Sequence, residues 1–179
     1  GAHNPGQREL PFCIHTRYST QQAILEDIVA SLYAQGMRKL IILSGHGGNN
    51  FKGMIRDLAF VYPDFLIIAA DWFSIVPPKD YFEAVVDDHA GESETSVMMH
   101  YHPELVNLAE AGDGESQPFA IPSLNEKVGW APRHWDKATV DSGVGNPKKA
   151  SAEKGKRYMK PVVEKLAKLF TEVGLGSLY

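Results

Sequence analysis

The chain has 179 residues, of which 44% are hydrophobic and 22% are charged, so it can bury one core but is too short for two ordinary domains. Its formal net charge of -4 and its interspersed charges argue against a nucleic-acid or membrane partner, and no apolar run approaches the roughly 18 residues of a spanning helix. The single cysteine, Cys13, excludes an intramolecular disulfide and a cysteine-rich zinc site. These features predict one compact domain, residues 1–179, in the cytoplasm.

Two helix-and-strand pairs are expected in the first half of the chain. Ser19-Thr20-Gln21-Gln22 matches a capping box ahead of apolar residues at helical spacing, and Gly36 should end that helix. The apolar run Leu40–Leu43 then has the pattern of a strand that is covered on both faces in a parallel sheet.

The pattern repeats once. Asn49 or Asn50 can cap a second helix, and Phe65–Ala70 reads as a second buried strand. Two such units in succession predict an α/β fold with a parallel sheet.

The second half of the chain is less regular. Residues 71–88 are expected to form a loop with a short helical turn at 81–85, and residues 92–102 a helix that Pro103 stops. Residues 109–145 predict a long covering loop. Its residues Trp130, His134 and Trp135 either close over a site or cover an apolar flank, and we favour the second. A final helix from about Ser151 to Val173 should be kinked or divided by Pro161.

Polar residues follow both predicted strands. His46 comes after the first strand and Asp71-Trp72 after the second, at the carboxyl ends where parallel sheets bind ligands. The glycines around His46 leave room for an ion or substrate, so its imidazole is either a metal ligand or a side chain that bonds nearby backbone. Trp72 is either a pocket wall or ordinary packing.

A second cluster, Asp87–Ser96, places one imidazole and four carboxylates at a loop-to-helix junction. Carboxylates at a helix N-terminus also complement the helix dipole, which accounts for Glu92 and Glu94 without any function. His89 fits that explanation less well, and a neutral imidazole there suits proton transfer or ligation. Because Glu92 and Glu94 would point about 200° apart on a regular helix, we expect them to have different roles.

Three groups of residues together resemble the creatininase (creatinine amidohydrolase) family. They are Leu43–Asn49, His89–Ser96, and the pair Ser142–Pro147 and Ala150–Gly155. The resemblance implies a three-layer α/β/α fold with a mostly parallel sheet. It also implies a site for two divalent metal ions, usually zinc or manganese and in some members iron. A metal-bound hydroxide would then hydrolyse a C–N bond of a cyclic or linear amide.

The resemblance also implies roles for individual residues. His46 resembles the family's metal-binding imidazole, and His89 resembles its proton-transferring histidine. Creatininases proper carry a ligating glutamate where this chain has Gly48, which weakens the case for creatinine itself as the substrate. In the branch with His-Gly-Gly-Asn a glutamate of the second motif replaces it, so Glu92 is predicted as a metal ligand and Glu94 as a catalytic residue that supports the site. Asn49 and Trp72 are the candidate substrate contacts.

Family members also have a Glu-x-His-Gly-x-His-Leu-Pro stretch and a bridging aspartate, which this sequence lacks. We therefore expect the chain to be incomplete at its N-terminal side and inactive by itself. The partners that the resemblance implies are a small-molecule amide and further copies of the chain, since creatininases assemble as hexamers. Two alternatives remain: a module that binds a small ligand at a helix N-terminus, and an inactive paralogue that acts through oligomer contacts.

Overall fold

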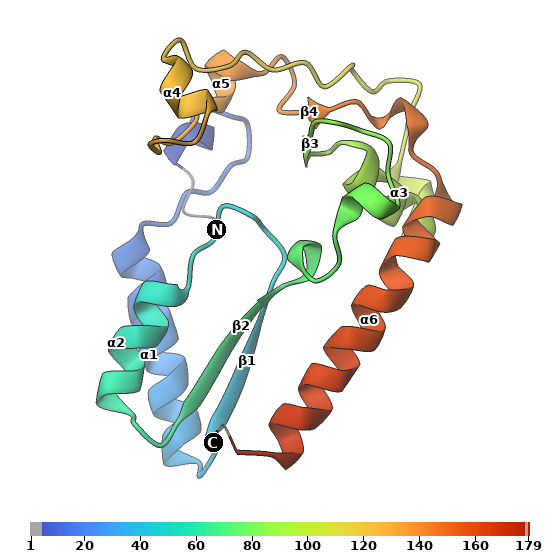
Figure 1. The fold of residues 1–179 in the computed structure, drawn as a ribbon. Helices are drawn as coiled ribbons and strands as arrows, with labels where there is room; N and C mark the ends of the chain where they lie inside the picture. The colour runs from blue at the N-terminus through green and yellow to red at the C-terminus, as the bar shows by residue number, and fades with distance from the viewer. Residues whose placement is uncertain (1–4, 178) are drawn as a thin grey trace. The chain divides into compact units, whose positions relative to one another are not determined.

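A computed structural model describes residues 5–177 and 179, and these fall into two compact units (Figure 1). The sheet unit holds Ile14–Ile75 and Val163–Tyr179, and the motif unit holds Pro5–Cys13 and Val76–Val162. The longest helix, α6, contributes residues to both. No helix within the described residues is both long enough and apolar enough to cross a membrane.

The elements follow one another along the chain in the order labelled in Figure 1. They are η1 (Pro5–Gln7), α1 (Tyr18–Ala34), β1 (Lys39–Ser44), α2 (Lys52–Val61), β2 (Leu66–Asp71), η2 (Trp72–Ser74), η3 (Pro78–Asp80), β3 (Asp87–His89), α3 (Glu92–Tyr101), η4 (Pro103–Leu105), α4 (Pro122–Asn125), α5 (Trp135–Ala138), β4 (Val144–Gly145), η5 (Pro147–Lys149) and α6 (Ala152–Leu175).

The sheet unit is built on β1 and β2, which pair in parallel and in continuous register from Lys39 opposite Leu66 to Ser44 opposite Asp71. Helices α1 and α2 lie on one side of this pair and the C-terminal part of α6 on the other (Figure 1). The ammonium group of Lys39 donates to carbonyl oxygens at the end of α6, at 2.7 Å from Val173. A cation is favourable at that end of a helix dipole. The predicted α/β class with parallel strands is confirmed.

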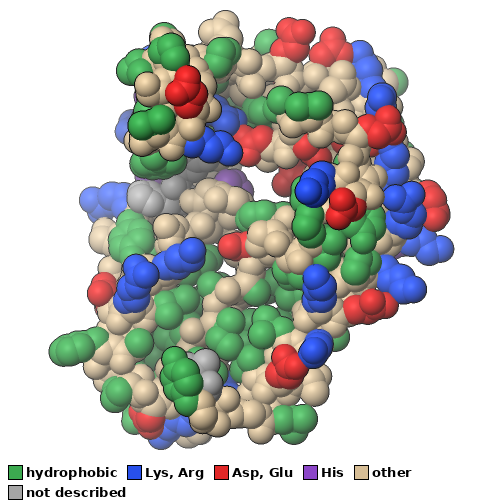
Figure 2. Space-filling model, in the orientation of Figure 1, with side chains coloured by type: hydrophobic (Ala, Val, Ile, Leu, Met, Phe, Trp, Pro, Cys, Tyr) green, Lys and Arg blue, Asp and Glu red, His purple; other side chains and the backbone are tan. Residues whose placement is uncertain are grey.

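The core of the sheet unit lies between its helices and one face of the strands. It consists of Leu25, Val29, Met54, Leu58, Phe65 and Ile67. The other expectation, a first strand covered on both faces, holds only in part for the described residues. Leu43 is 51% exposed, and Figure 2 shows hydrophobic side chains at the surface over β1 and β2. The C-terminal part of α6 lies on one side of the strand pair and α1 and α2 on the other, yet together they leave the end of β1 at Leu43 exposed.

The two ends of α1 differ in how well the sequence predicted them. Gly36 has a φ of +86°, its N–H bonds the Tyr33 carbonyl, and the Met37 N–H bonds the Leu32 carbonyl, which makes a Schellman ending as expected. The capping box at Ser19 is wrong, because the helix begins at Tyr18 without a side-chain cap. Gln22, instead of reaching back, donates to Glu26 and Asp57.

The motif unit joins the short antiparallel pair of β3 and β4 to α3 and the first half of α6. Its core is aromatic: the Tyr158 ring packs edge-on against Phe82 with centroids 5.1 Å apart, and the Tyr158 hydroxyl donates to the Val76 carbonyl at 3.2 Å. Burial raises the pKa of Tyr158, which keeps this hydroxyl a donor.

Three local predictions for the second half need correction. The helical turn expected at 81–85 is wrong: 3₁₀ turns lie at Trp72–Ser74 and Pro78–Asp80, where Pro78 starts the second one. The expected loop 109–145 contains the short helices α4 and α5 and the strand β4. Pro161 does not divide α6, because the burial of Tyr158 and Val162 on either side offsets the one lost hydrogen bond; the alternative of a kink stays a prediction.

Candidate functional site

In the sheet unit, the residues after β1 and after β2 lie at the same edge of the sheet. Ser44 pairs with Asp71 at the ends of the strands, so the His46 loop and Trp72 both leave from that edge. This confirms that the two segments leave the same edge of the sheet, while a ligand crevice at that edge stays a prediction. Trp72 is half-buried and its ring meets that of Phe73 edge-on, with centroids 6.0 Å apart.

The His46 side chain is held by its own loop. Its Nδ1 accepts the Gly48 N–H at 2.8 Å, while its carbonyl accepts the Asn49 N–H at 3.1 Å. An Nδ1 that accepts a hydrogen bond places the proton of the neutral ring on Nε2. Ligation through Nε2 would require the other tautomer, and ligation through Nδ1 would replace Gly48 as its partner. The described structure therefore has the backbone-bonded arrangement, and the ligand role stays a prediction.

The candidate substrate contact Asn49 is half-buried in the same loop. Its neighbour Asn50, rather than Asn49, provides the side-chain bond at the start of α2, because Asn50 Oδ1 accepts the Lys52 N–H at 3.1 Å. The Asn49 side chain is thus not used in capping the helix.

In the motif unit, α3 holds the turn that carries His89. Ala90 has a φ of +51°, an uncommon backbone conformation for a residue with a Cβ. The Glu94 carboxylate accepts the Ala90 N–H at 2.7 Å, and the Thr95 hydroxyl donates to the Ala90 carbonyl at 3.1 Å. Two side chains from the first turn of the helix thus bind both backbone polar groups of Ala90.

His89 itself lies between a carboxylate and an indole. Its Nδ1 is 3.7 Å from Glu94 Oε2, and its ring meets the Trp135 ring at 77° with centroids 5.3 Å apart. The imidazole is about one-third exposed. A carboxylate near one ring nitrogen can orient an imidazole while the other nitrogen exchanges a proton with a substrate.

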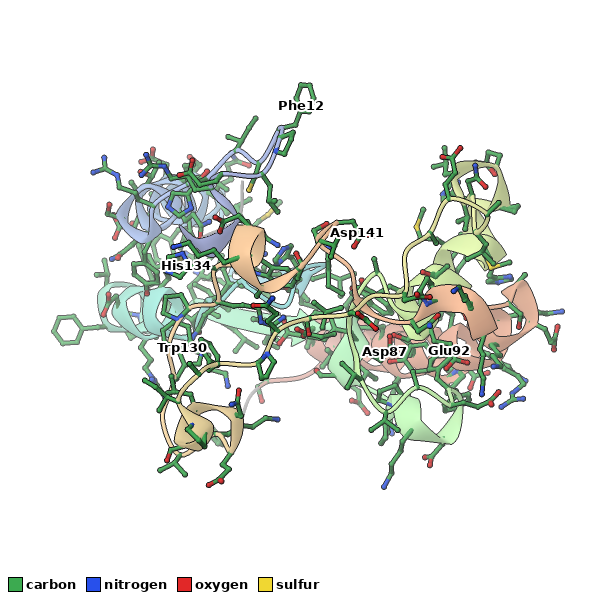
Figure 3. The ribbon with its side chains drawn as sticks, turned by 90° about the horizontal axis from the view of Figure 1, so that it is seen from above. Phe12, Asp87, Glu92, Trp130, His134 and Asp141 are labelled. Carbon is green, nitrogen blue, oxygen red and sulfur yellow. The ribbon has the colours of Figure 1, made fainter. Side chains whose placement is uncertain are left out.

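Glu92 is fully buried and each of its carboxylate oxygens has protein donors. One oxygen accepts the backbone N–H groups of Glu83 and Ala84, each at 2.8 Å, and the other accepts the Lys154 ammonium at 2.5 Å. In Figure 3 its side chain lies close to that of Asp87. A metal ion at Glu92 would have to compete with these donors, so its ligand role also stays a prediction.

Asp87 stabilises the start of α3. Its carboxylate accepts the Ser93 N–H at 3.0 Å. It thus satisfies a backbone donor in the first turn of α3, as a capping side chain would. Burial raises the pKa of Asp87 although the Ser93 bonds oppose the rise. Gly91 permits this approach, since a Cβ there would lie 2.2 Å from Asp87 Oδ1.

The third group of motif residues packs against the second. Ser96 is buried, and its hydroxyl accepts the Ser151 N–H at 3.1 Å, just before α6. One turn into α6, Gly155 faces the Ser96 carbonyl so closely that a Cβ would lie 2.0 Å from that oxygen. Gly145, with a φ of +116°, lies in the β4 strand that pairs with β3. These segments therefore form the support of the His89 turn.

Glu83 forms ion pairs with Lys149 and Lys154, and their effect on the pKa of Glu83 can be measured. Hydrogen bonds from Lys149 and then Lys154 lower the pKa of Glu83 from 4.5 to about 2. A depressed folded-state pKa means that the stabilisation is present above 4.5 and is lost as the pH falls toward about 2. We expect the ¹³C carboxyl resonance of Glu83 to titrate near 2, and Lys149→Ala to move its midpoint upward. A wild-type midpoint near 4.5 would contradict the pairing.

The described residues do not by themselves form a complete metal site. Among residues 5–177 and 179, no three His, Cys, Asp or Glu side chains converge as ligands. Catalytic zinc normally has three protein ligands.

Sequence reasoning missed two residues of this arrangement. Lys154 lies 62 positions from Glu92, and Trp135 belongs to a segment that was expected to cover an apolar flank. Periodicity provides no signal for either contact. Only the Ala150–Gly155 part of the resemblance pointed toward the region of Lys154.

Comparisons with known proteins agree on one family. The family model described as creatinine amidohydrolase matches residues 1–170. A crystal structure of a Bacteroides fragilis protein, provisionally named a creatinine amidohydrolase, is 83% identical, with a TM-score of 0.96 over all of this chain and 71% of the other. A mutant creatininase of the Zn-Zn type has a TM-score of 0.74 at 21% identity, over 92% of this chain and 67% of the other, which supports the α/β creatininase fold alone.

A relative from Mycobacterium ulcerans carries a different name. It is called a mycofactocin precursor peptide peptidase and is 32% identical over 131 residues, which is 70% of this chain and 45% of that protein. The chain thus spans less than half of this relative and 71% of the Bacteroides fragilis protein.

Proposed function

This chain belongs to the creatininase family, whose members are hydrolases, and from that premise we propose that its protein is a metal-dependent amidohydrolase that cleaves an amide C–N bond. The observation that carries the proposal is the family match over residues 1–170, which includes both the His46 loop and the His89 turn. Small cyclic or linear amides are the first substrates to test. The relative named as a peptidase adds short peptides to them.

His89 is the residue we propose for proton transfer. Its imidazole is partly exposed, and Nδ1 faces the Glu94 carboxylate at 3.7 Å. In that orientation Nε2 is available to donate a proton to the leaving nitrogen as the C–N bond breaks. Glu94 would orient the imidazole and, through its bond to Ala90, fix the turn. Asn49 and Trp72 remain the proposed substrate contacts in the sheet unit.

A divalent ion, zinc or manganese and in some relatives iron, is proposed as the cofactor, with two ions in the intact protein. When bound, it would lower the pKa of a water and polarise the amide oxygen. His46 has a ring nitrogen to offer after a change of tautomer, and its loop glycines leave space for an ion. Glu92 is retained as a proposed ligand on the family resemblance, although its oxygens already have three donors.

One experiment separates the roles of the two histidines. We expect His46→Ala to lower the metal content of the purified full-length protein. We expect His89→Ala to keep its metal but lose about 10²- to 10⁴-fold in turnover, the usual contribution of acid–base catalysis. His134→Ala, at an exposed histidine, is the matched control for both readouts. Unchanged turnover in His89→Ala would rule out its role, and unchanged metal in His46→Ala would rule out ligation.

The same measurements test the alternatives. A small-ligand-binding module or an inactive paralogue acting through oligomer contacts predicts no turnover of any amide in the metal-loaded protein. The mass of the assembly in solution tests the proposed homo-oligomer. Hydrolysis of an amide that depends on His89 would exclude both non-enzymatic readings.

A further inference from the structure

The Trp135 indole packs against the His89 imidazole from another element of the motif unit. Trp135 is the first residue of α5 and is only 8% exposed. Its ring meets the imidazole at 77°, with centroids 5.3 Å apart. Edge-to-face aromatic pairs stabilise a structure by more than the burial of their area alone provides. The indole therefore limits the orientations that the imidazole can adopt.

Trp135 is in turn fixed by its own neighbours. The Arg133 guanidinium lies over the indole at 4.8 Å from the ring centroid, and it donates to the Asp88 carboxylate at 2.7 Å. Asp88 precedes His89 on β3, so these contacts lead back to the backbone of the histidine. The backbone of Trp135 is also held, because its carbonyl accepts a hydrogen bond from the Thr139 hydroxyl at 2.7 Å.

We propose that Trp135 is a positioning residue for His89, with Arg133 holding the indole in place. The proposal rests on the proton-transfer role proposed for His89. The Glu94 carboxylate lies 3.7 Å from Nδ1 of His89, and the indole packs against the imidazole ring. Two different contacts therefore define the orientation of the imidazole. Loss of the indole would reduce the fraction of molecules with a correctly oriented imidazole, and it would not remove a substrate contact.

The test compares Trp135→Leu with Trp130→Leu in the full-length, metal-loaded protein. Trp130 is 86% exposed and lies on the same segment, so it allows the same substitution at a surface position. For Trp135→Leu we expect kcat to fall about threefold to tenfold at unchanged KM, as loss of one aromatic contact implies. The ring-proton resonances of His89 should move as well, because the indole ring current is lost. Trp135→Phe should recover most of kcat, and Trp130→Leu should change neither readout.

The two readouts distinguish failure of this proposal from failure of the proposed function. His89 ring resonances that are the same in wild type and Trp135→Leu would overturn the positioning role, whether or not any amide is hydrolysed. Absence of turnover in the wild type would refute the hydrolase and leave the resonances to decide the positioning. If Trp135→Leu does not fold, Arg133→Met takes its place. For that variant we expect a smaller change in the His89 ring resonances and a smaller loss of kcat. Unchanged resonances in that variant would also overturn the proposal.

Discussion

Replacing Lys154 by methionine is expected to destabilise the protein by about 3–5 kcal/mol, because the change leaves the Glu92 carboxylate buried without its cation. The Glu92 side chain is 1% exposed, so water cannot replace the ammonium group. The two backbone donors at Glu83 and Ala84 would remain, but neither carries a full charge. Urea unfolding of the two proteins measures the difference.

The double variant Glu92→Gln with Lys154→Met separates the ion pair from the packing of its chains. Replacing both partners of a buried pair is often close to neutral, so we expect the double variant to recover much of the loss. Lys156→Met, at an exposed position of the same helix, is the control and should change stability by less than about 0.5 kcal/mol. A Lys154→Met protein as stable as this control would contradict the buried ion pair.

The effect of Lys154 has a defined pH window. The hydrogen bonds that the Lys154 ammonium donates to Glu92 and then to Glu83 raise the pKa of Lys154 above its ordinary value of 10.5. A raised folded-state pKa means that the stabilisation is complete below 10.5 and is lost as the pH rises through the folded value. The difference between wild type and Lys154→Met should therefore be constant near neutral pH and shrink only in strong alkali.

The second large effect is expected from Gly155→Ala. A Cβ at this position would lie 2.0 Å from the Ser96 carbonyl oxygen, and backbone cannot turn aside as a flexible side chain can. Overpacking of this kind costs about 1–3 kcal/mol and occasionally more. Because Ser96 also holds Ser151 through its hydroxyl, the shift should reach the start of α6.

Gly174 provides a control with the opposite sign in the same helix. A Cβ there meets no heavy atom within 4 Å, so Gly174→Ala should stabilise the protein by roughly 0.5–1 kcal/mol through helix propensity alone. The pair of variants is compared by thermal unfolding. A Gly155→Ala protein at least as stable as wild type would contradict the close approach of α3 and α6 at Gly155.

The sequence predicted best what short-range patterns encode. The apolar runs at Leu40–Leu43 and Phe65–Ala70 became the paired strands, and the stop at Pro103 and the turn at Gly36 fell where expected. Helical geometry placed Glu92 and Glu94 on different sides of α3 and predicted different roles for them; the roles stay a prediction, but the surroundings of the two carboxylates do differ. Glu92 is buried against Lys154, and Glu94 reaches the Ala90 turn.

The sequence predicted poorly what depends on distant partners. Gln22 left the capping box because Asp57, 35 positions away, accepts its amide. Trp135 was expected to cover an apolar flank, yet its ring packs on His89. No periodicity marks such contacts, since each is set by how separate elements pack. The family resemblance indicated which segments belong together, but not which atom of Glu92 or His46 would already have a partner.

The positive φ of Ala90 has a consequence for the order in which this region assembles. A left-handed conformation costs an alanine roughly 1–2 kcal/mol, so residues 87–91 have no reason to adopt the turn while they are isolated. The Glu94 and Thr95 side chains that compensate for this cost become available only once α3 has formed. The histidine turn therefore depends on the first turn of α3, and the orientation of His89 is set by the helix that follows it.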